Sequence, residues 1–170
     1  LQHVENITQV YKLPCVVAIN RFPGDTEAEL ALVEERCREL GVNVALSEVW
    51  ARGGEGGLAV AEEVVRLCEQ PNEFELCYKD DLGLKGKLEA VATRVYPADG
   101  VDFAPAALAD IAQLEALGFG EMPVCVAKTQ YSFSDDPKKL GAPRGFRVLV
   151  RSCKVSAGAG FVVALTGDIM

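Results

Sequence analysis

Two short apolar runs, separated by one helix-patterned segment, constrain the fold of this chain more than any other feature. The first run is C-V-V-A-I at residues 15–19, and the second covers residues 42–49. Continuous rather than alternating apolarity is typical of strands covered on both faces, as in parallel sheets. The segment between the runs has apolar residues at helical spacing and is followed by Gly41, where a C-cap glycine belongs. With a second helix at residues 58–69, this order predicts a right-handed βαβα unit with parallel strands.

Further segments complete the first predicted domain. We expect a helix over residues 1–11, a short strand at residues 76–78, and a helix over residues 84–96 that ends at Pro97. In the helix at residues 58–69, the side chains expected to face inward are those of Ala61, Val64, Val65 and Cys68.

The rest of the chain predicts a second, smaller α/β domain. We place a boundary near residue 100, which gives a βαβα domain with a parallel sheet at residues 1–100 and a smaller α/β domain at residues 101–170. The predicted elements of the second domain are a helix at residues 105–117, strands at 123–127, 146–155 and 161–165, and a long polar loop at 128–145.

Composition argues against several classes of function. The 170 residues carry a formal net charge of -8, so the basic surface that nucleic-acid binding requires is missing. No apolar run approaches the roughly 20 residues of a membrane-spanning helix. The six cysteines include no C-x-x-C pair, and Cys15 and Cys125 lie in strand-like runs. We therefore expect reduced thiols in a cytoplasmic protein. The single histidine, His3, has no neighbouring ligand cluster that would indicate a metal site.

Two unusual turns follow the paired strands and mark the candidate site. One is N-R-F-P-G-D at residues 20–25, and the other is S-E-V-W-A-R-G-G-E-G-G at residues 47–57. Turns at the carboxyl ends of neighbouring parallel strands meet at one edge of the sheet, where ligands bind in open α/β folds. Phe22 and the only tryptophan, Trp50, are therefore candidates for stacking on a flat heterocycle. Packing of both rings in the core is the alternative, and the residues alone favour neither.

The stretch after Trp50 has two interpretations as well. It consists of Gly53, Gly54, Glu55, Gly56 and Gly57. Glycines before a helix can present N–H groups to an anion, or they can form a purely structural turn. The stretch is not a Walker A motif, because no Lys-Ser or Lys-Thr follows it, and its spacing is not G-x-G-x-x-G. The flanking Arg21 and Arg52 could pair with a carboxylate or phosphate, or they could be solvated rim charges.

Four longer stretches are similar to one enzyme family. They are V-V-A-I-N-R-F-P-G-D-T-E-A-E, A-L-S-E-V-W-A-R-G-G-E-G-G, L-G-F-G-E-M-P-V-C-V-A-K-T-Q-Y-S-F-S-D-D-P and S-A-G-A-G-F-V-V-A-L-T-G-D-I-M. In these stretches, and from Leu1 to Met170, the chain resembles the C-terminal part of formate–tetrahydrofolate ligase, also called formyltetrahydrofolate synthetase.

This resemblance implies a reaction and a substrate site. The family uses ATP and magnesium to phosphorylate formate, and N10 of tetrahydrofolate then attacks the formyl phosphate to give 10-formyltetrahydrofolate. In the family, an aromatic ring of the R-F-P turn and the tryptophan of S-E-V-W sandwich the folate ring. The resemblance assigns this role to Phe22 and Trp50, and it implies that Arg21 and the stretch Gly53–Gly57 line the cleft.

The resemblance also implies what the chain needs from elsewhere. The phosphate-gripping P-loop belongs to the N-terminal part of the family and has no counterpart in this sequence, so no catalytic residue is assigned here. We expect the chain to be inactive alone, and to act with the missing N-terminal part of the same protein in a homo-oligomeric ligase. The alternative is a non-catalytic structural or interaction module derived from that family.

Overall fold

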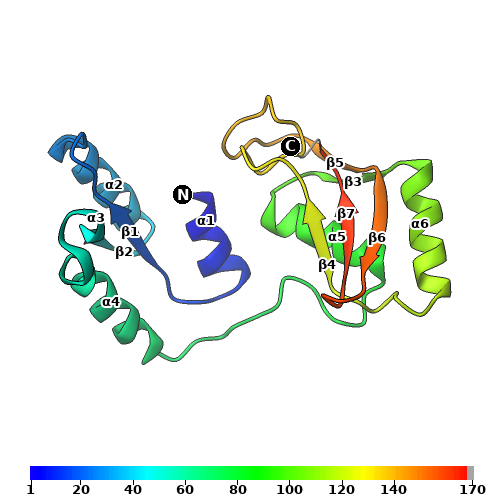
Figure 1. Ribbon diagram of the computed structural model, residues 1–170, viewed down its shortest axis with the longest axis horizontal. Coiled ribbons are helices and arrows are strands. Elements are labelled where there is room, and N and C mark those ends of the chain that lie inside the picture. The colour runs from blue at the N-terminus through cyan, green and yellow to red at the C-terminus, as the bar shows by residue number, and fades with distance from the viewer. Residues whose placement is uncertain (168–170) are drawn as a thin grey trace. The chain divides into compact units, whose positions relative to one another are not determined.

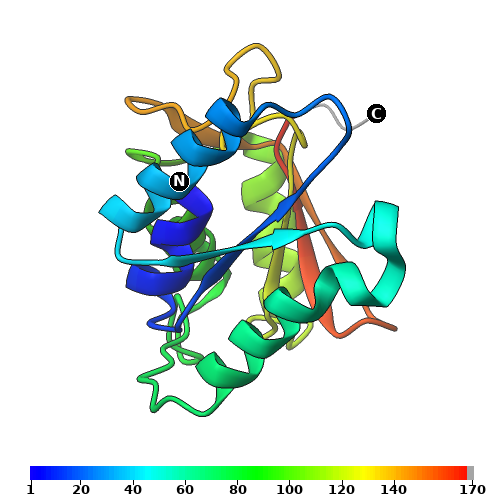
Figure 2. The same ribbon diagram turned by 90° about the vertical axis from the view of Figure 1, so that its left-hand side faces the viewer.

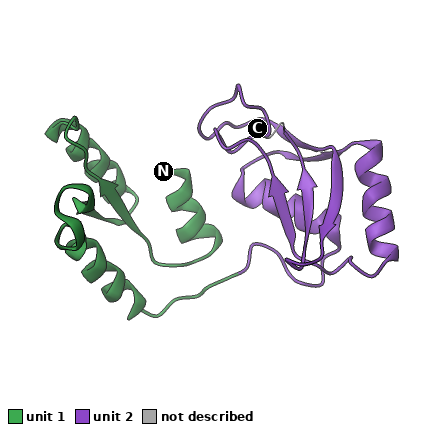
Figure 3. Cartoon of the chain, viewed as in Figure 1, with its two compact units in different colours: residues 1–75 green, residues 76–170 purple. Residues whose placement is uncertain are grey.

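The computed structural model describes residues 1–167 and consists of two compact units (Figures 1 and 3). The first unit is Leu1–Glu75, and the second begins at Leu76. Both units combine helices with parallel strands, so the predicted α/β class is confirmed. The division differs from the boundary predicted near residue 100. The helix predicted over residues 84–96 buries its apolar face in the core of the second unit, and that places it after the division.

The first unit is built on a two-stranded parallel sheet. Its elements are α1 (Gln2–Glu5), the π-helical turn η1 (Asn6–Val10), β1 (Val16–Asn20), α2 (Glu27–Glu39), β2 (Asn43–Ser47), α3 (Val49–Arg52), the 3-10 turn η2 (Gly53–Gly57) and α4 (Leu58–Cys68). β1 pairs with β2 in a register that aligns Val16 with Asn43, as the parallel prediction required. Figure 2 shows α2 and α4 on opposite sides of the strand pair.

Helix α2 is fixed at both ends by its sequence. The Thr26 hydroxyl accepts a hydrogen bond from the Glu29 N–H at 3.3 Å, and the Glu29 carboxylate accepts one from the Thr26 N–H at 2.9 Å. This reciprocal pair is a capping box. After the helix, Gly41 adopts φ +70°, the left-handed conformation predicted for a C-cap glycine. The buried cluster beside this helix consists of Val4, Cys37 and Val42.

The second strand of the unit is shorter than predicted. β2 ends at Ser47, and α3 begins at Val49, within the predicted strand. The cause is a backbone hydrogen bond at 3.0 Å from the Glu48 N–H to the Gly56 carbonyl oxygen, which turns the chain away from β1.

The prediction for the inward face of α4 is wrong. All four side chains expected to face inward are exposed, and α4 has no buried residue; these side chains are Ala61, Val64, Val65 and Cys68. Val60, Glu63 and Leu67 are half-buried instead. A sheet of two strands presents too little surface to cover a helix of this apolarity.

The second unit contains the larger core. Its elements are α5 (Leu84–Ala90), the π-helical turn η3 (Val91–Val95), β3 (Gly100–Phe103), α6 (Pro105–Ala116), β4 (Val124–Ala127), β5 (Arg147–Val150), β6 (Ser152–Ser156) and β7 (Phe161–Leu165). β3 and β5 form a parallel pair. In the second sheet, the central strand β7 is parallel to β4 and antiparallel to β6. Leu88, Ile111 and Val162 are among the residues that form the core between these elements.

Three predictions for this unit are corrected. Residues 76–78 form no strand, and β3 was not predicted. The strand predicted over residues 146–155 is two strands of different sheets, β5 and β6. The change of sheet occurs at Arg151, whose N–H donates to the Leu165 carbonyl oxygen at 2.8 Å and so joins the ladder of β7.

Two further features concern the cysteines and the helices. All six cysteines lie among the described residues, and no disulfide joins them. Within residues 1–167, no helix combines the length and apolarity that crossing a membrane would require.

Candidate functional site

Phe22 is presented to solvent by a turn that its own sequence closes. The Arg21 N–H donates to the Ser47 carbonyl oxygen at 2.9 Å, which carries the pairing with β2 one residue past the end of β1. The turn then closes through Asp25, whose carboxylate accepts from the Phe22 N–H at 2.8 Å and whose N–H donates to the Phe22 carbonyl oxygen at 3.0 Å. The backbone of Phe22 is thus satisfied locally, while its side chain is 52% exposed.

Trp50 lies on the short helix α3 directly after β2, and its side chain is 71% exposed. The predicted glycines form the support for this helix. A Cβ atom on Gly56 would lie 2.4 Å from the Glu48 carbonyl carbon, so only glycine permits the approach of these two backbone segments. Gly53 adopts φ +57°, where a side chain would be strained. The turn therefore holds a large apolar side chain out of the core.

The two aromatic rings lie side by side, as predicted from the ends of neighbouring strands. Their centroids are 6.5 Å apart, and their planes are inclined by 47°. A flat ring stacked between two parallel rings requires about 7 Å between them, twice a carbon–carbon contact of roughly 3.5 Å. Both side chains are more than half exposed, so core packing does not hold either ring in its present orientation. The structure thus brings Phe22 and Trp50 together outside the core, which contradicts the core-packing alternative.

The charged groups beside the rings are engaged with one another. The Arg21 guanidinium pairs with Glu27, and the Arg52 guanidinium pairs with Glu48 at 3.1 Å. Glu55 is exposed within the glycine stretch. Exposed pairs of this kind contribute little to stability, so either arginine can exchange its partner for a ligand carboxylate at small cost.

The glycine stretch itself has the features of a structural turn. The residues after it start α4 with no side-chain cap at Gly57. The approach of Gly56 to Glu48 and the left-handed Gly53 account for two of the four glycines through backbone geometry alone. At Gly54, by contrast, an added Cβ would meet nothing within 4 Å.

Comparison with known proteins places the whole chain in one family. The family model described as formate–tetrahydrofolate ligase matches residues 1–170. The formate–tetrahydrofolate ligase of Symbiobacterium thermophilum is 58% identical over 170 residues, which are 100% of this chain and 31% of that protein.

The chain belongs to the formate–tetrahydrofolate ligase family. It spans about a third of the length of the curated relative that it matches. The resemblance inferred from the four sequence stretches is thereby confirmed at the level of the family.

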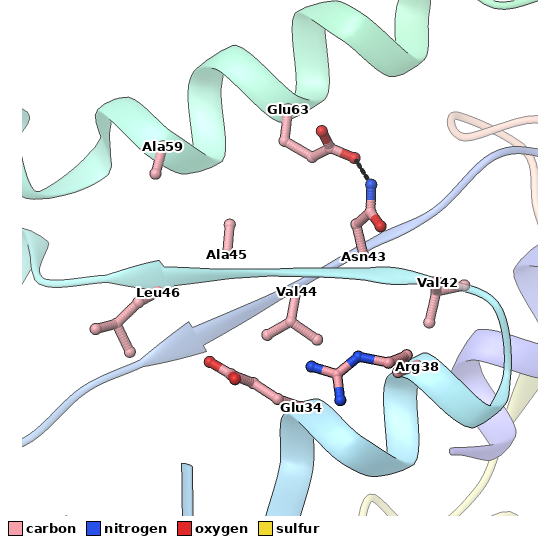
Figure 4. Close-up of a pocket in the computed structure, with 9 residues that line it drawn as sticks. All are labelled: Glu34, Arg38, Val42, Asn43, Val44, Ala45, Leu46, Ala59 and Glu63. Carbon is pink, nitrogen blue, oxygen red and sulfur yellow. Dashed lines mark hydrogen bonds between the residues drawn. The ribbon is translucent and has the colours of Figure 1, made fainter. Parts of the chain in front are cut away.

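Some features of this ligase segment escaped the sequence analysis. A groove of about 470 Å³ runs along β2 between α2 and α4, and its lining includes Glu34, Arg38 and Glu63 (Figure 4). Glu63 accepts hydrogen bonds from Arg66 and from Asn43 of β2, and these bonds lower the pKa of Glu63 to about 2. Nothing in the sequence distinguishes Glu34, Arg38 and Glu63 from charged residues on the solvent-exposed face of a helix.

The loop predicted over residues 128–145 is held by its own polar groups. The Lys128 ammonium donates to the carbonyl oxygens of Thr129, at 2.8 Å, and of Ser132, and it lies 5.2 Å from the centre of the Tyr96 ring. Partial burial lowers the pKa of Lys128. The Asp135 carboxylate accepts from the Leu149 N–H at 2.9 Å. Through these contacts, polar groups of the loop find hydrogen-bond partners within the second unit. They indicate no ligand for the loop.

Proposed function

We propose that this chain is the folate-side segment of a formate–tetrahydrofolate ligase, in which Phe22 and Trp50 hold the folate ring. The ligase joins formate and tetrahydrofolate at the expense of ATP, giving 10-formyltetrahydrofolate, ADP and phosphate. The observation that carries this proposal is the exposed pair of rings, 6.5 Å apart, in a member of this family. Two exposed aromatic side chains at one sheet edge are costly in water and suit a flat heterocycle.

The contribution of this segment to the reaction is orientation. Transfer of the formyl group requires the amine N10 to lie close to the formyl carbon, and a ring held on both faces fixes the position of that amine. Each stacking contact contributes about 0.5–1.5 kcal/mol beyond area burial. The charge stabilisation that phosphoryl transfer requires is a separate contribution. We assign no residue of this chain to it.

ATP and magnesium are implied by the resemblance, but these residues do not fit either one. Within residues 1–167, no group of three or more His, Cys, Asp or Glu side chains could hold a metal ion. The glycine stretch packs its backbone against Glu48 and carries a carboxylate at Glu55, which opposes a phosphate. We therefore derive no step through the nucleotide or metal, and we assign both to the remainder of the ligase polypeptide.

The folate role is tested by Phe22→Ala in the intact ligase that contains this segment. Loss of one stacking face is expected to raise the KM for tetrahydrofolate about two- to twelve-fold, the equivalent of 0.5–1.5 kcal/mol. The KM values for ATP and formate should not change. The matched control is Phe74→Ala, because Phe74 is 54% exposed in the same unit but is not paired with Trp50. An unchanged KM for tetrahydrofolate in Phe22→Ala would contradict the proposal.

The dependence on the remaining polypeptide has its own test. The 170-residue chain alone should release no ADP from ATP in the presence of formate, because it lacks the lysine loop that grips phosphate. Formate-dependent ADP release from the pure chain would overturn this part of the proposal.

A further inference from the structure

The two-stranded sheet of the first unit has two free edges, and they differ in chemistry. Beside β2, the groove of about 470 Å³ is lined by charged side chains of both helices, including Glu34, Arg38 and Glu63 (Figure 4). Beside β1, a hollow of about 360 Å³ is lined almost entirely by apolar residues: Leu13, Pro14, Val16, Val64, Leu67, Cys68 and Asn72. The exposed apolar side chains of α4 and the edge of β1 therefore border the same apolar hollow.

The strands are alike in sequence, and only their surroundings differ. β1 reads V-V-A-I-N and β2 reads N-V-A-L-S, so neither has the charge or proline that protects an exposed edge strand. Beside β2, Asn43 donates to Glu63 at 2.7 Å. The edge of β2 is thus bordered by charged side chains, whereas the edge of β1 is bordered by apolar ones, which suit another apolar strand.

The backbone identifies the donors at the free edge of β1. Because the Arg21 N–H donates toward β2, alternation along the strand directs the N–H groups of Ile19 and Val17 to β2 as well. The N–H groups of Ala18 and Asn20 then point to the free edge. Ala18 offers the edge both a donor and an acceptor in the middle of the strand.

We propose that the edge of β1 and the side chains of Val16, Val64 and Leu67 bind one more apolar β-strand, parallel to β1, from the ligase polypeptide outside these 170 residues. The chain covers only 31% of the relative from Symbiobacterium thermophilum, and the remainder of such a polypeptide could supply the strand. A second copy of β1 related by a two-fold axis would pair antiparallel and make a mixed sheet, whereas a parallel strand continues the order of β1 and β2. This inference rests on the proposal that the chain works within the intact ligase.

Hydrogen exchange at single-residue resolution tests the pairing in unmutated protein. In the 170-residue chain, the Ala18 amide should exchange at least ~100-fold faster than the Ile19 amide, because only Ile19 donates within the sheet. In the intact ligase, the two amides should be protected to within about ten-fold of each other. Fast exchange of Ala18 in the intact ligase would overturn the proposal. Protection of Ala18 in the chain alone that rises with concentration would assign the edge to a second copy and would overturn it too.

Two neighbouring valines of α4 provide a matched pair of variants. Val64 lines the hollow beside β1, whereas Val65 lies among Glu62, Arg66 and Glu69. In the intact ligase, Val64→Asp should abolish the protection of Ala18 or prevent recovery of folded enzyme, and Val65→Asp should change neither. Equal effects of the two substitutions would contradict the docking surface. Neither readout involves folate. If Phe22→Ala leaves the KM for tetrahydrofolate unchanged while the Ala18 amide is protected in the intact ligase, the folate role is refuted and the strand pairing is not.

Discussion

The two units of this chain bury their apolar side chains to very different extents. The second unit has a cluster of fourteen buried apolar residues, whereas the cluster of the first unit has three. The difference lies in the sheets. In the second unit, the helices pack on a three-stranded sheet and a strand pair. In the first unit, α2 and α4 have only β1 and β2 to pack against. Apolar periodicity in the first unit therefore does not lead to burial within that unit, as the exposed Val64 and Val65 of α4 show.

The largest expected effect compares a leucine in each unit. Leu88 is 2% exposed in the core of the second unit, and Leu32 is 52% exposed on α2. Leu88→Ala should lower the free energy of unfolding of the second unit by about 2–5 kcal/mol, whereas Leu32→Ala should change that of the first by less than about 0.5 kcal/mol. Denaturant unfolding monitored by circular dichroism checks both. A similar cost for the two leucines would show that the first unit is as well packed as the second.

A second pair of substitutions tests the support for Trp50. Gly56→Ala should destabilise the turn by about 1–3 kcal/mol, because its Cβ would lie 2.4 Å from the Glu48 backbone. At Gly54, nothing lies within 4 Å of an added Cβ, so Gly54→Ala should have a much smaller effect. Trp50 is the only tryptophan, so its fluorescence during unfolding reports this turn alone. If both substitutions shift the Trp50 transition equally, the close backbone approach is not what holds the turn.

The cap of α2 should matter less. Thr26→Ala removes the side-chain acceptor of the capping box and is expected to cost the first unit about 1 kcal/mol. Thr26→Ser keeps the hydroxyl and serves as the control. Equal stability of the alanine and serine variants, measured by the same Trp50 unfolding curve, would argue against the cap.

The two units should also lose stability at opposite ends of the pH range, by modest amounts. Hydrogen bonds from Arg66 and Asn43 lower the pKa of Glu63 from 4.5 to about 2, so this stabilisation of the first unit is lost as the pH falls through that interval. Burial raises the pKa of the Cys153 thiol from 9.0 to about 11, so this stabilisation of the second unit is lost as the pH rises between those values.

Thermal unfolding as a function of pH measures both losses. Glu63→Gln should flatten the acid decline of the first unit, and Cys153→Ala should flatten the alkaline decline of the second. A decline that is unchanged in its variant would mean that the group does not titrate as described.

Local sequence signals predicted a large part of the fold. Strands β1, β4 and β7 and the glycine at position 41 were recognised because each depends on its own neighbours. Strand β3 was missed because its four residues, close to Pro105, are too few to show a recognisable alternation of apolar and polar side chains. The break at Arg151 was missed because alternation continues through it, and only the pairing with Leu165 separates the two strands.

The candidate site was predictable in position but not in detail. The ends of two parallel strands had to place Phe22 and Trp50 at one edge, and the structure does so. The exposure of Val64 and Val65 was not predictable from helical periodicity, because it depends on how few strands the first unit offers to α4. The Glu63 carboxylate and the Asn43 amide likewise meet only through the tertiary packing of α4 beside β2.

Hydrogen exchange of the 170-residue chain tests the contrast between the units most directly. Amides of β1 and β2 that donate within their pair, such as that of Ile19, should exchange through local opening of low free energy. The amides of β7, the central strand of its sheet, should exchange only when the second unit unfolds. We predict protection at least ~100-fold greater in β7 than in β1 and β2. Equal protection of the two strand sets would contradict the conclusion that the first unit is the less well packed of the two.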